Sequence, residues 1–171
     1  MNKFKALSIV FAVLMMAGCA STDVTETDGA TSSDQDRRAM EQEQADKRIA
    51  AEASKAQQML EDAVANAGNV VYFDFDKSTL TAATRSTLDA HIALLKTNNA
   101  TVRLEGHTDE RGTREYNMAL GERRAKAVGS YMAVNGVASY RAEAISYGEE
   151  RPVATGTGEA NWSQNRRVEI K

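Results

Sequence analysis

The sequence predicts an α/β fold, a two-layer sandwich in which helices pack on one mixed β-sheet. From residue 70 onward, short runs rich in β-branched and aromatic residues alternate with longer segments whose apolar residues recur at three- and four-residue steps. The order is strand, helix, strand, helix, strand, strand. Successive strand–helix–strand units place helices over the sheet, with right-handed crossovers where the strands run parallel. Residues 70–171 are therefore expected to form one compact domain.

The first strand and the first helix of this domain are predicted at Val70–Phe75 and Thr81–Thr97. The strand is bounded by turn-forming residues, and its Tyr72, Phe73 and Phe75 are expected in the core. In the helix the apolar residues lie on one face, and two asparagines follow its last residue. An amphipathic helix is therefore expected to cover the sheet directly after the first strand.

The second strand and helix are predicted at Thr101–Glu105 and Arg114–Asn135. Apolar and polar residues alternate with period two along the strand, and Gly106 closes it. Gly136 suits the left-handed backbone position that often ends a helix. The last two strands are expected at Ala142–Ser146 and Arg166–Ile170.

The N-terminus has the three-part form of a secretory signal, with Lys3 and Lys5 ahead of an apolar run that ends in small residues. The run is too short to span a bilayer as a helix. Its end, Met16–Cys19, resembles the lipobox of bacterial lipoproteins, in which the signal is cleaved before a cysteine that is then acylated. The alternative is an ordinary cleaved signal beside an unrelated cysteine. Because Cys19 is the only cysteine, it cannot form an internal disulfide in an oxidising compartment.

We therefore expect residues 1–18 to be a cleaved lipoprotein signal peptide and Cys19 to be the acylated N-terminus. The acyl chains that the lipoprotein resemblance implies give stable anchoring, whereas one chain alone binds a membrane only marginally. Ala20 follows the cysteine, and by resemblance to sorted lipoproteins this favours the outer membrane. The domain is then expected to face the periplasm.

Residues 19–69 are predicted to be a tether between this anchor and the domain. Ser21–Ser33 has almost no large apolar side chains and is expected to be a disordered leash. Asp34–Ala67 is rich in helix-favouring residues and lacks Gly and Pro, but its apolar residues are too sparse for a coiled-coil seam. A solvated or weakly self-associating helix of this length would span roughly 50 Å at about 1.5 Å per residue.

Charge is distributed unevenly along the chain. Residues 20–69 contain 11 acidic and 5 basic side chains, whereas residues 70–171 contain 13 acidic and 14 basic ones. The domain is thus nearly neutral, and no basic stripe with interleaved aromatic residues is present in the sequence. A nucleic-acid partner is excluded, because a protein that binds nucleic acid carries a basic patch or stripe and this domain has none.

Arg124 is the unusual residue of the second helix. It lies four positions before Val128, so it occupies or borders the face of the helix that carries the apolar residues. A buried, unpaired cation is costly and requires an anion in good geometry. The anion is either an internal carboxylate, Asp109 or another acid of the loop Gly106–Gly112, or a ligand. The pattern leaves both interpretations open.

The loop Gly106–Gly112 lies between the second strand and the second helix, a position where α/β sheets commonly bind ligands. Arginine side chains on helices lean toward the N-terminus, so Arg124 points toward this loop. If Asp109 and Arg124 lie side by side without neutralising each other, they suit a ligand that carries both an ammonium and a carboxylate group. The residues thus indicate a zwitterionic ligand, such as one end of an amino acid.

Several spaced blocks of residues 70–171 resemble the peptidoglycan-associated lipoproteins, whose domain has the OmpA-like C-terminal fold. These blocks are Tyr72–Lys77, Glu105–Thr113, Glu115–Asn117, Leu120–Ala125 and Asn165–Arg167. The resemblance implies that Asp109 and Arg124 hold the amino and carboxylate groups of diaminopimelate in the peptidoglycan stem. It also implies that Asp76, Arg111, Thr113 and the backbone near Leu120 contribute to the same pocket. Relatives often have proline at Arg114 and tyrosine at Trp162, and neither difference replaces a ligand-holding residue.

The resemblance implies a non-enzymatic wall-binding protein of a Tol-Pal-type system, without a metal or cofactor, and a TolB-like periplasmic protein as a partner. One alternative is an OmpA-like lipoprotein that acts mainly as a protein-interaction adaptor. A second is a metal site or hydrolase, but the domain has only two histidines and no serine or cysteine nucleophile in a recognisable setting. The candidate residues for such a metal site or hydrolase are Asp74, Asp76, His107, Asp109 and Glu110. Arg166 and Arg167 are expected at a partner surface or a solvated strand end.

Overall fold

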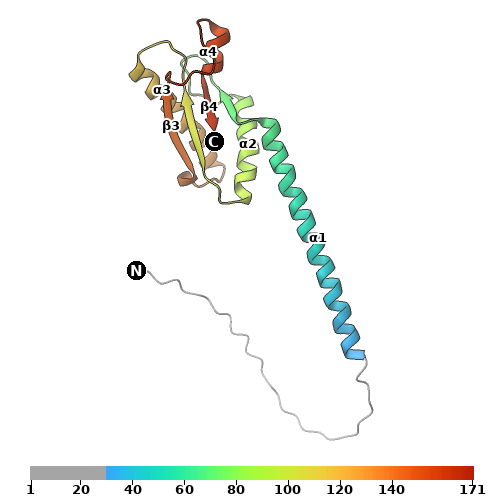
Figure 1. Cartoon of the computed structure of the whole chain (residues 1–171). Helices are drawn as coiled ribbons and strands as arrows, with labels where there is room; N and C mark the ends of the chain where they lie inside the picture. Colours follow the sequence, from blue (N-terminus) through green and yellow to red (C-terminus); the bar gives the residue numbers. More distant parts are fainter. Residues whose placement is uncertain (1–29) are drawn as a thin grey trace, which may run out of the picture. The chain divides into compact units, whose positions relative to one another are not determined.

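The structure, a computed structural model, describes residues 30–171 (Figure 1). The chain divides into two compact units, residues 1–44 and 45–171, and each is considered by itself. The predictions for the signal peptide, Cys19 and most of the leash lie outside the described residues. Between residues 30 and 171, no helix combines the length and the apolar character that crossing a bilayer requires.

The predicted tether helix is present as α1 (Ala30–Ala67), a 38-residue helix. It begins before Asp34, so residues 30–33 are helical and their assignment to the leash was wrong. Serine and threonine are favoured at helix N-termini as well as in loops, so composition alone did not fix this boundary.

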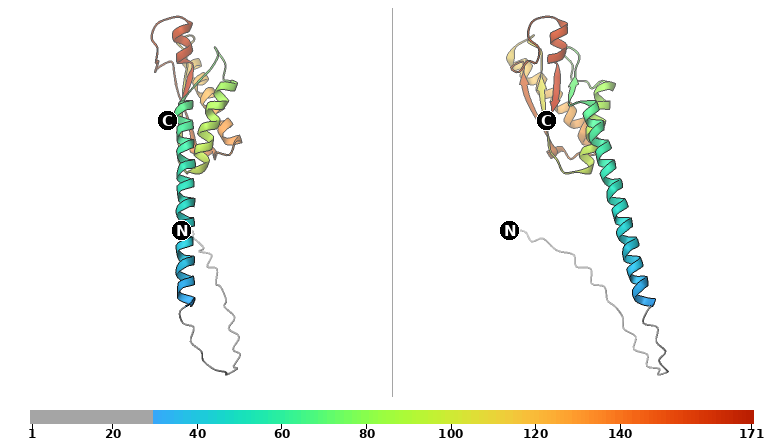
Figure 2. Two further views of the ribbon diagram at one scale, coloured as in Figure 1. Left: turned by 90° about the vertical axis from the view of Figure 1, so that its right-hand side faces the viewer. Right: turned by 45° about the vertical axis from the view of Figure 1, so that its right-hand side comes forward.

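The described domain has one four-stranded sheet, in the order β1-β4-β2-β3, which is visible in Figures 1 and 2. Its last strand in sequence, β4, is inserted between β1 and β2 and is antiparallel to both, whereas β2 and β3 are parallel. The sheet is therefore mixed, and the predicted α/β class is confirmed. The elements are β1 (Val70–Tyr72), α2 (Ala82–Thr97), β2 (Val102–His107), α3 (Arg114–Val134), the 3₁₀ turn η1 (Ser139–Arg141), β3 (Ala142–Gly148), α4 (Glu159–Asn165) and β4 (Arg167–Ile170).

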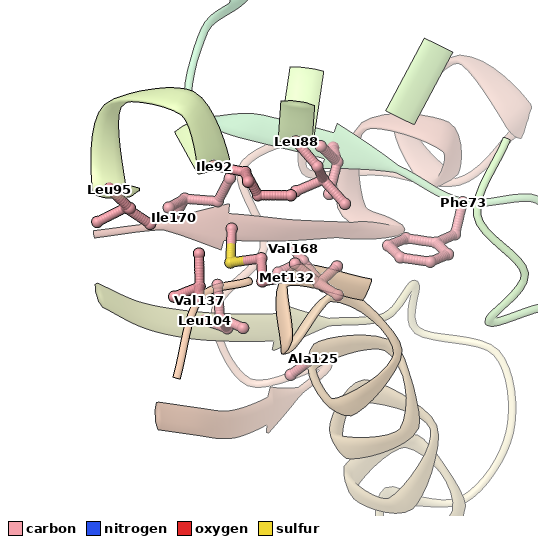
Figure 3. Packing of buried hydrophobic residues seen from close by; sticks show 12 residues of the cluster. Phe73, Leu88, Ile92, Leu95, Leu104, Ala125, Met132, Val137, Val168 and Ile170 are labelled. Atoms are coloured by element: carbon pink, nitrogen blue, oxygen red, sulfur yellow. The ribbon is translucent and has the colours of Figure 1, made fainter. Parts of the chain in front are cut away.

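Helices α2 and α3 bury their apolar faces against the same side of the sheet. The cluster joins Leu88 and Ile92 of α2, Met132 of α3, and Leu104 and Val168 of the central strands (Figure 3). Both helices are fixed at their N-termini by threonine caps, because the side chain of the residue before each helix accepts a backbone N–H of its first turn. The site described below lies where this packed layer meets the end of β2.

Helix α3 approaches β2 so closely that two glycines are required. A Cβ atom on Gly106 would lie 2.0 Å from the carbonyl oxygen of Gly121, and one on Gly121 would lie 2.3 Å from the Ser146 hydroxyl oxygen. Neither distance is compatible with any side chain, so the two backbones touch directly. This contact places the first half of α3 over the C-terminal end of β2.

The structure corrects the predicted end of the first strand. Strand β1 stops at Tyr72. Of the aromatic residues in the predicted strand only Phe73 is buried, whereas Tyr72 and Phe75 are 52% and 55% exposed. The chain leaves the sheet after Tyr72, and Asp76 adopts a left-handed backbone with φ of 55°. The prediction that Tyr72 and Phe75 lie in the core was therefore wrong. Tyr72 points to the face opposite its buried neighbours Val71 and Phe73, because side chains alternate along a strand, and Phe75 lies beyond the end of the strand.

The short helix α4 was not predicted. It has seven residues and follows Gly158, in a stretch between the last two predicted strands to which the sequence assigned no helix or strand. Two turns of helix are too short to show a clear three- and four-residue period. Helix α4 nevertheless contributes to the site, since it carries Glu159 and Trp162 toward the loop after β2.

Candidate functional site

A pocket of about 210 Å³ opens where β2 ends and α3 begins. Five residues singled out in the sequence line it, namely Asp76, Asp109, Arg111, Leu120 and Arg124. The remaining lining residues are Phe75, Thr108, Gly112, Tyr116 and Asn117. Thr113 does not line the pocket. It caps α3 instead, and its hydroxyl oxygen accepts the backbone N–H of Tyr116 at 3.2 Å.

Arg124 of α3 is fully buried, as its place on the apolar stripe predicted. Its guanidinium donates to three backbone carbonyls, those of Lys77 and His107 at 2.9 Å and that of Asp74 at 3.1 Å. Within residues 30–171 no ion pair joins it to a carboxylate, so the internal salt bridge, one of the two interpretations that the sequence left open, is not formed. Burial lowers the pKa of Arg124 to about 10. Arg124 thus ties the loop after β1 to the end of β2, and it brings to the pocket a positive charge that no carboxylate of the described residues contacts directly, although Asp109 and Asp76 lie near enough to favour it.

Asp109 is also buried, with 4% of its surface exposed. Its Oδ1 accepts the backbone N–H and the Nε–H of Arg111, both at 3.2 Å. Its Oδ2 accepts from Arg111 Nη2 at 2.7 Å and from Arg166 Nη1 at 3.3 Å. Burial alone would raise the pKa of the Asp109 carboxyl, but these hydrogen bonds, chiefly those from Arg111, hold it below its usual range. Asp109 is therefore an anion with two arginine partners.

Two aromatic rings hold the guanidinium of Arg111. Its central carbon lies 4.0 Å from the ring centre of Phe75 and 4.1 Å from that of Trp162, so cation–π contacts flank both sides. Trp162 in turn donates its indole N–H to Glu110 at 3.2 Å. Helix α4 is thereby fastened to the loop that carries Asp109.

Asp76 lies at the exposed mouth of the pocket. It accepts a short hydrogen bond from the hydroxyl of Tyr116 in the first turn of α3. The side chain of Tyr116 is 44% exposed, and its hydroxyl holds the loop after β1. A non-glycine residue with a left-handed backbone is uncommon, and such residues often accompany functional sites.

Sequence reasoning missed the part that the end of the chain plays in this site. Arg166 and Arg167 were expected to be solvated or on a partner surface, but both are buried. Arg166 donates to the Phe73 carbonyl at 3.0 Å and pairs with Asp109 and with Glu159. No local pattern marks Arg166, because two of its three partners, Phe73 and Asp109, are distant in sequence. The sole tryptophan, an aromatic residue in a polar loop, was the one available signal for α4.

The acidic and histidine residues considered for a metal site or hydrolase do not converge. His107 is buried, neither ring nitrogen has a hydrogen-bond partner, and burial, followed by the nearby Arg167, lowers its pKa to about 4. Among the residues from 30 to 171, no three His, Cys, Asp or Glu side chains group as metal ligands. Asp109 is engaged by arginines rather than directed at a nucleophile.

A mixed sheet with helices on one face, and a charged pocket at the junction of β2 and α3, define a two-layer α/β domain suited to binding a small charged group. Residues 72–166 match the OmpA family. This match covers more than half of the chain, which belongs to the OmpA family.

Individual relatives within this family carry a common name. The chain is 56% identical over 111 residues to the peptidoglycan-associated lipoprotein of Pseudomonas putida. The aligned region covers 65% of this chain and 67% of that protein. The chain is 55% identical over 111 residues to the protein of the same name from Pseudomonas aeruginosa, with 65% and 66% covered. The similar regions thus span about two thirds of these proteins.

A crystal structure of the peptidoglycan-associated lipoprotein from Burkholderia pseudomallei shares the fold. It is 44% identical, with a TM-score of 0.59, and covers 61% of this chain and 89% of that one. The OmpA-like resemblance inferred from the spaced sequence blocks is therefore confirmed.

Proposed function

We propose that this protein is an outer-membrane lipoprotein that binds peptidoglycan non-covalently through the diaminopimelate of the peptide stem. It links the outer membrane to the cell wall as part of a Tol-Pal-type system that maintains envelope integrity and supports cell division. Asp109 binds the ammonium group of the stem residue and Arg124 binds its carboxylate. Asp76, Arg111, Thr113 and the backbone near Leu120 complete or support the pocket.

The observation that carries this proposal is the buried Arg124 with carbonyl partners only. Carbonyls satisfy hydrogen bonds, but no carboxylate of the described residues pairs directly with the guanidinium, and a buried cation favours an incoming carboxylate. The guanidinium retains further N–H donors for such a ligand. Because Asp109 lines the same small pocket, one ligand end with both charges can reach both side chains. The names of the relatives support peptidoglycan as the source of that ligand.

The remaining parts of the proposal concern the position of the protein in the envelope. Acyl chains on Cys19 hold the outer membrane, residues 19–69 form the tether, and the domain from residue 70 faces the periplasm. A TolB-like periplasmic protein is its protein partner, whereas no nucleic acid and no cofactor take part. The protein acts by binding and not by catalysis.

Sedimentation of the full-length protein with purified sacculi tests wall binding. Asp109→Asn removes the charge that holds the ammonium, and Arg124→Lys keeps a cation but loses the planar guanidinium. We expect both variants to lose most of their sedimentation with sacculi whose stem contains diaminopimelate. Asp89→Asn and Arg85→Lys, the same changes on the exposed face of α2, should sediment like the parent protein.

Three results distinguish the alternatives. Retained binding by both pocket variants, with native circular dichroism, would refute the site. Equal sedimentation of the parent with sacculi that contain lysine in place of diaminopimelate would refute the proposed ligand. Absence of sedimentation in the parent, together with binding to a TolB-like protein, would favour the adaptor function.

The anchor is tested separately. We expect Cys19→Ala to move the protein from the membrane fraction to the soluble fraction without changing its sedimentation with sacculi, because the acyl chains and the pocket are independent. A variant that stays with the membrane would contradict lipidation at Cys19.

A further inference from the structure

Asp109 has no unused hydrogen-bonding capacity in this structure. Each of its two carboxylate oxygens accepts two hydrogen bonds, and three of the four come from Arg111. A ligand ammonium therefore cannot simply be added to Asp109. One of the present donors must leave first.

Arg111 is the donor that can leave. Its side chain is 30% exposed, whereas that of Arg166 is 6% exposed. Arg166 is also held by the Phe73 carbonyl at 3.0 Å and by Glu159, so moving it would break contacts with the segment after β1 and with α4. A second carboxylate lies within reach of Arg111. Its guanidinium contacts the rings of Phe75 and Trp162, and its Nη2 is 4.0 Å from an oxygen of Glu159. A shift of this guanidinium toward Glu159 would free the Asp109 oxygens that the Arg111 side chain now occupies.

We propose that Arg111 is an internal counter-ion of Asp109 that an incoming ammonium group displaces, so that Arg111 sets the affinity of the pocket instead of holding the ligand. This inference rests on the proposed function, because it assigns the ammonium to Asp109. Binding then exchanges one charge-assisted pair for another and gains little energy at this carboxylate.

The exchange predicts an effect opposite to that of a ligand-holding residue. In Arg111→Lys the positive charge remains, but a single ammonium cannot span both carboxylate oxygens or stack between two rings as a guanidinium does. Arg111→Gln removes the charge. If Arg111 competes with the ligand, both variants bind more tightly than the parent protein.

The test is isothermal titration calorimetry of the full-length protein with meso-diaminopimelate. Pimelate, which has the same chain and both carboxylates but no ammonium, is the comparison ligand. We expect Arg111→Lys and Arg111→Gln to bind diaminopimelate about fivefold more tightly, the contribution that a partly exposed ion pair makes. Pimelate has no group that displaces Arg111, so its affinity should not rise in Arg111→Lys. Arg85→Lys, on the exposed face of α2, should match the parent for both ligands.

Each outcome decides between the roles of Arg111. Weaker binding of diaminopimelate by Arg111→Lys would show that Arg111 holds the ligand and would overturn the inference. Tighter binding only in Arg111→Gln would mean that local charge acts and not competition, which also overturns it. If the parent binds neither diaminopimelate nor sacculi, the proposed function fails as well. If the parent binds and the variants do not gain, only the inference fails.

Discussion

Replacing Arg124 by methionine isolates its role in holding the domain together. The change keeps an unbranched side chain of similar length, but the carbonyls of Asp74, Lys77 and His107 lose their donor. Hydrogen bonds from a charged donor contribute about 1.5 to 3 kcal/mol each, so three amount to about 4.5 to 9 kcal/mol. Part of this is offset, because a pKa lowered to about 10 corresponds to about 3 kcal/mol against the buried charge. We therefore expect the free energy of unfolding to fall by about 3 kcal/mol.

Urea unfolding measures this change, with circular dichroism and the emission of Trp162, the only tryptophan, as probes. Arg123→Met is the matched control, because Arg123 precedes Arg124 in α3 but is exposed, and its loss should alter stability by less than about 0.5 kcal/mol. Small domains have about 5 to 15 kcal/mol in total, so Arg124→Met should remain folded at room temperature. If it were as stable as the Arg123→Met control, the three carbonyl bonds would not stabilise the domain and the reasoning would be refuted.

Three further predictions concern pH, packing and the unpredicted helix. Because burial lowers the pKa of His107 to about 4, the unfolded state binds the proton more readily. The free energy of unfolding should therefore fall by up to about 3 kcal/mol between pH 6.5 and 4, and a urea series on His107→Gln should lack this slope. Gly106→Ala should destabilise the domain by more than about 3 kcal/mol because its Cβ meets the Gly121 backbone. Gly129→Ala should be neutral or stabilise by up to about 1 kcal/mol, because its Cβ would lie 3.4 Å from the nearest atom, Cδ1 of Leu104. Thermal melts of both variants measure the difference. Arg166→Lys should weaken sacculus sedimentation while Lys171→Arg does not, and equal sedimentation would exclude a positioning role for Arg166.

The elements that the sequence located well are those with a local cause. Helices α2 and α3 lie within one residue of their predicted bounds, because periodic apolar residues and a threonine cap mark each of them. Gly136 has the predicted left-handed backbone, with φ of 100°. By contrast, no local sequence pattern indicates that β4 lies between β1 and β2, because pairing between strands distant in sequence depends on how the whole layer packs.

For the candidate site, the sequence by itself determined which residue is unusual. A cation on the apolar stripe of α3 must be buried, and Arg124 is. The tertiary structure decided what the charged residues touch. The carbonyl partners of Arg124 lie 17, 47 and 50 residues away, and Asp109 meets Arg166 from 57 residues away. Periodicity reports only which face a side chain occupies, whereas its partners depend on segments that only folding brings together.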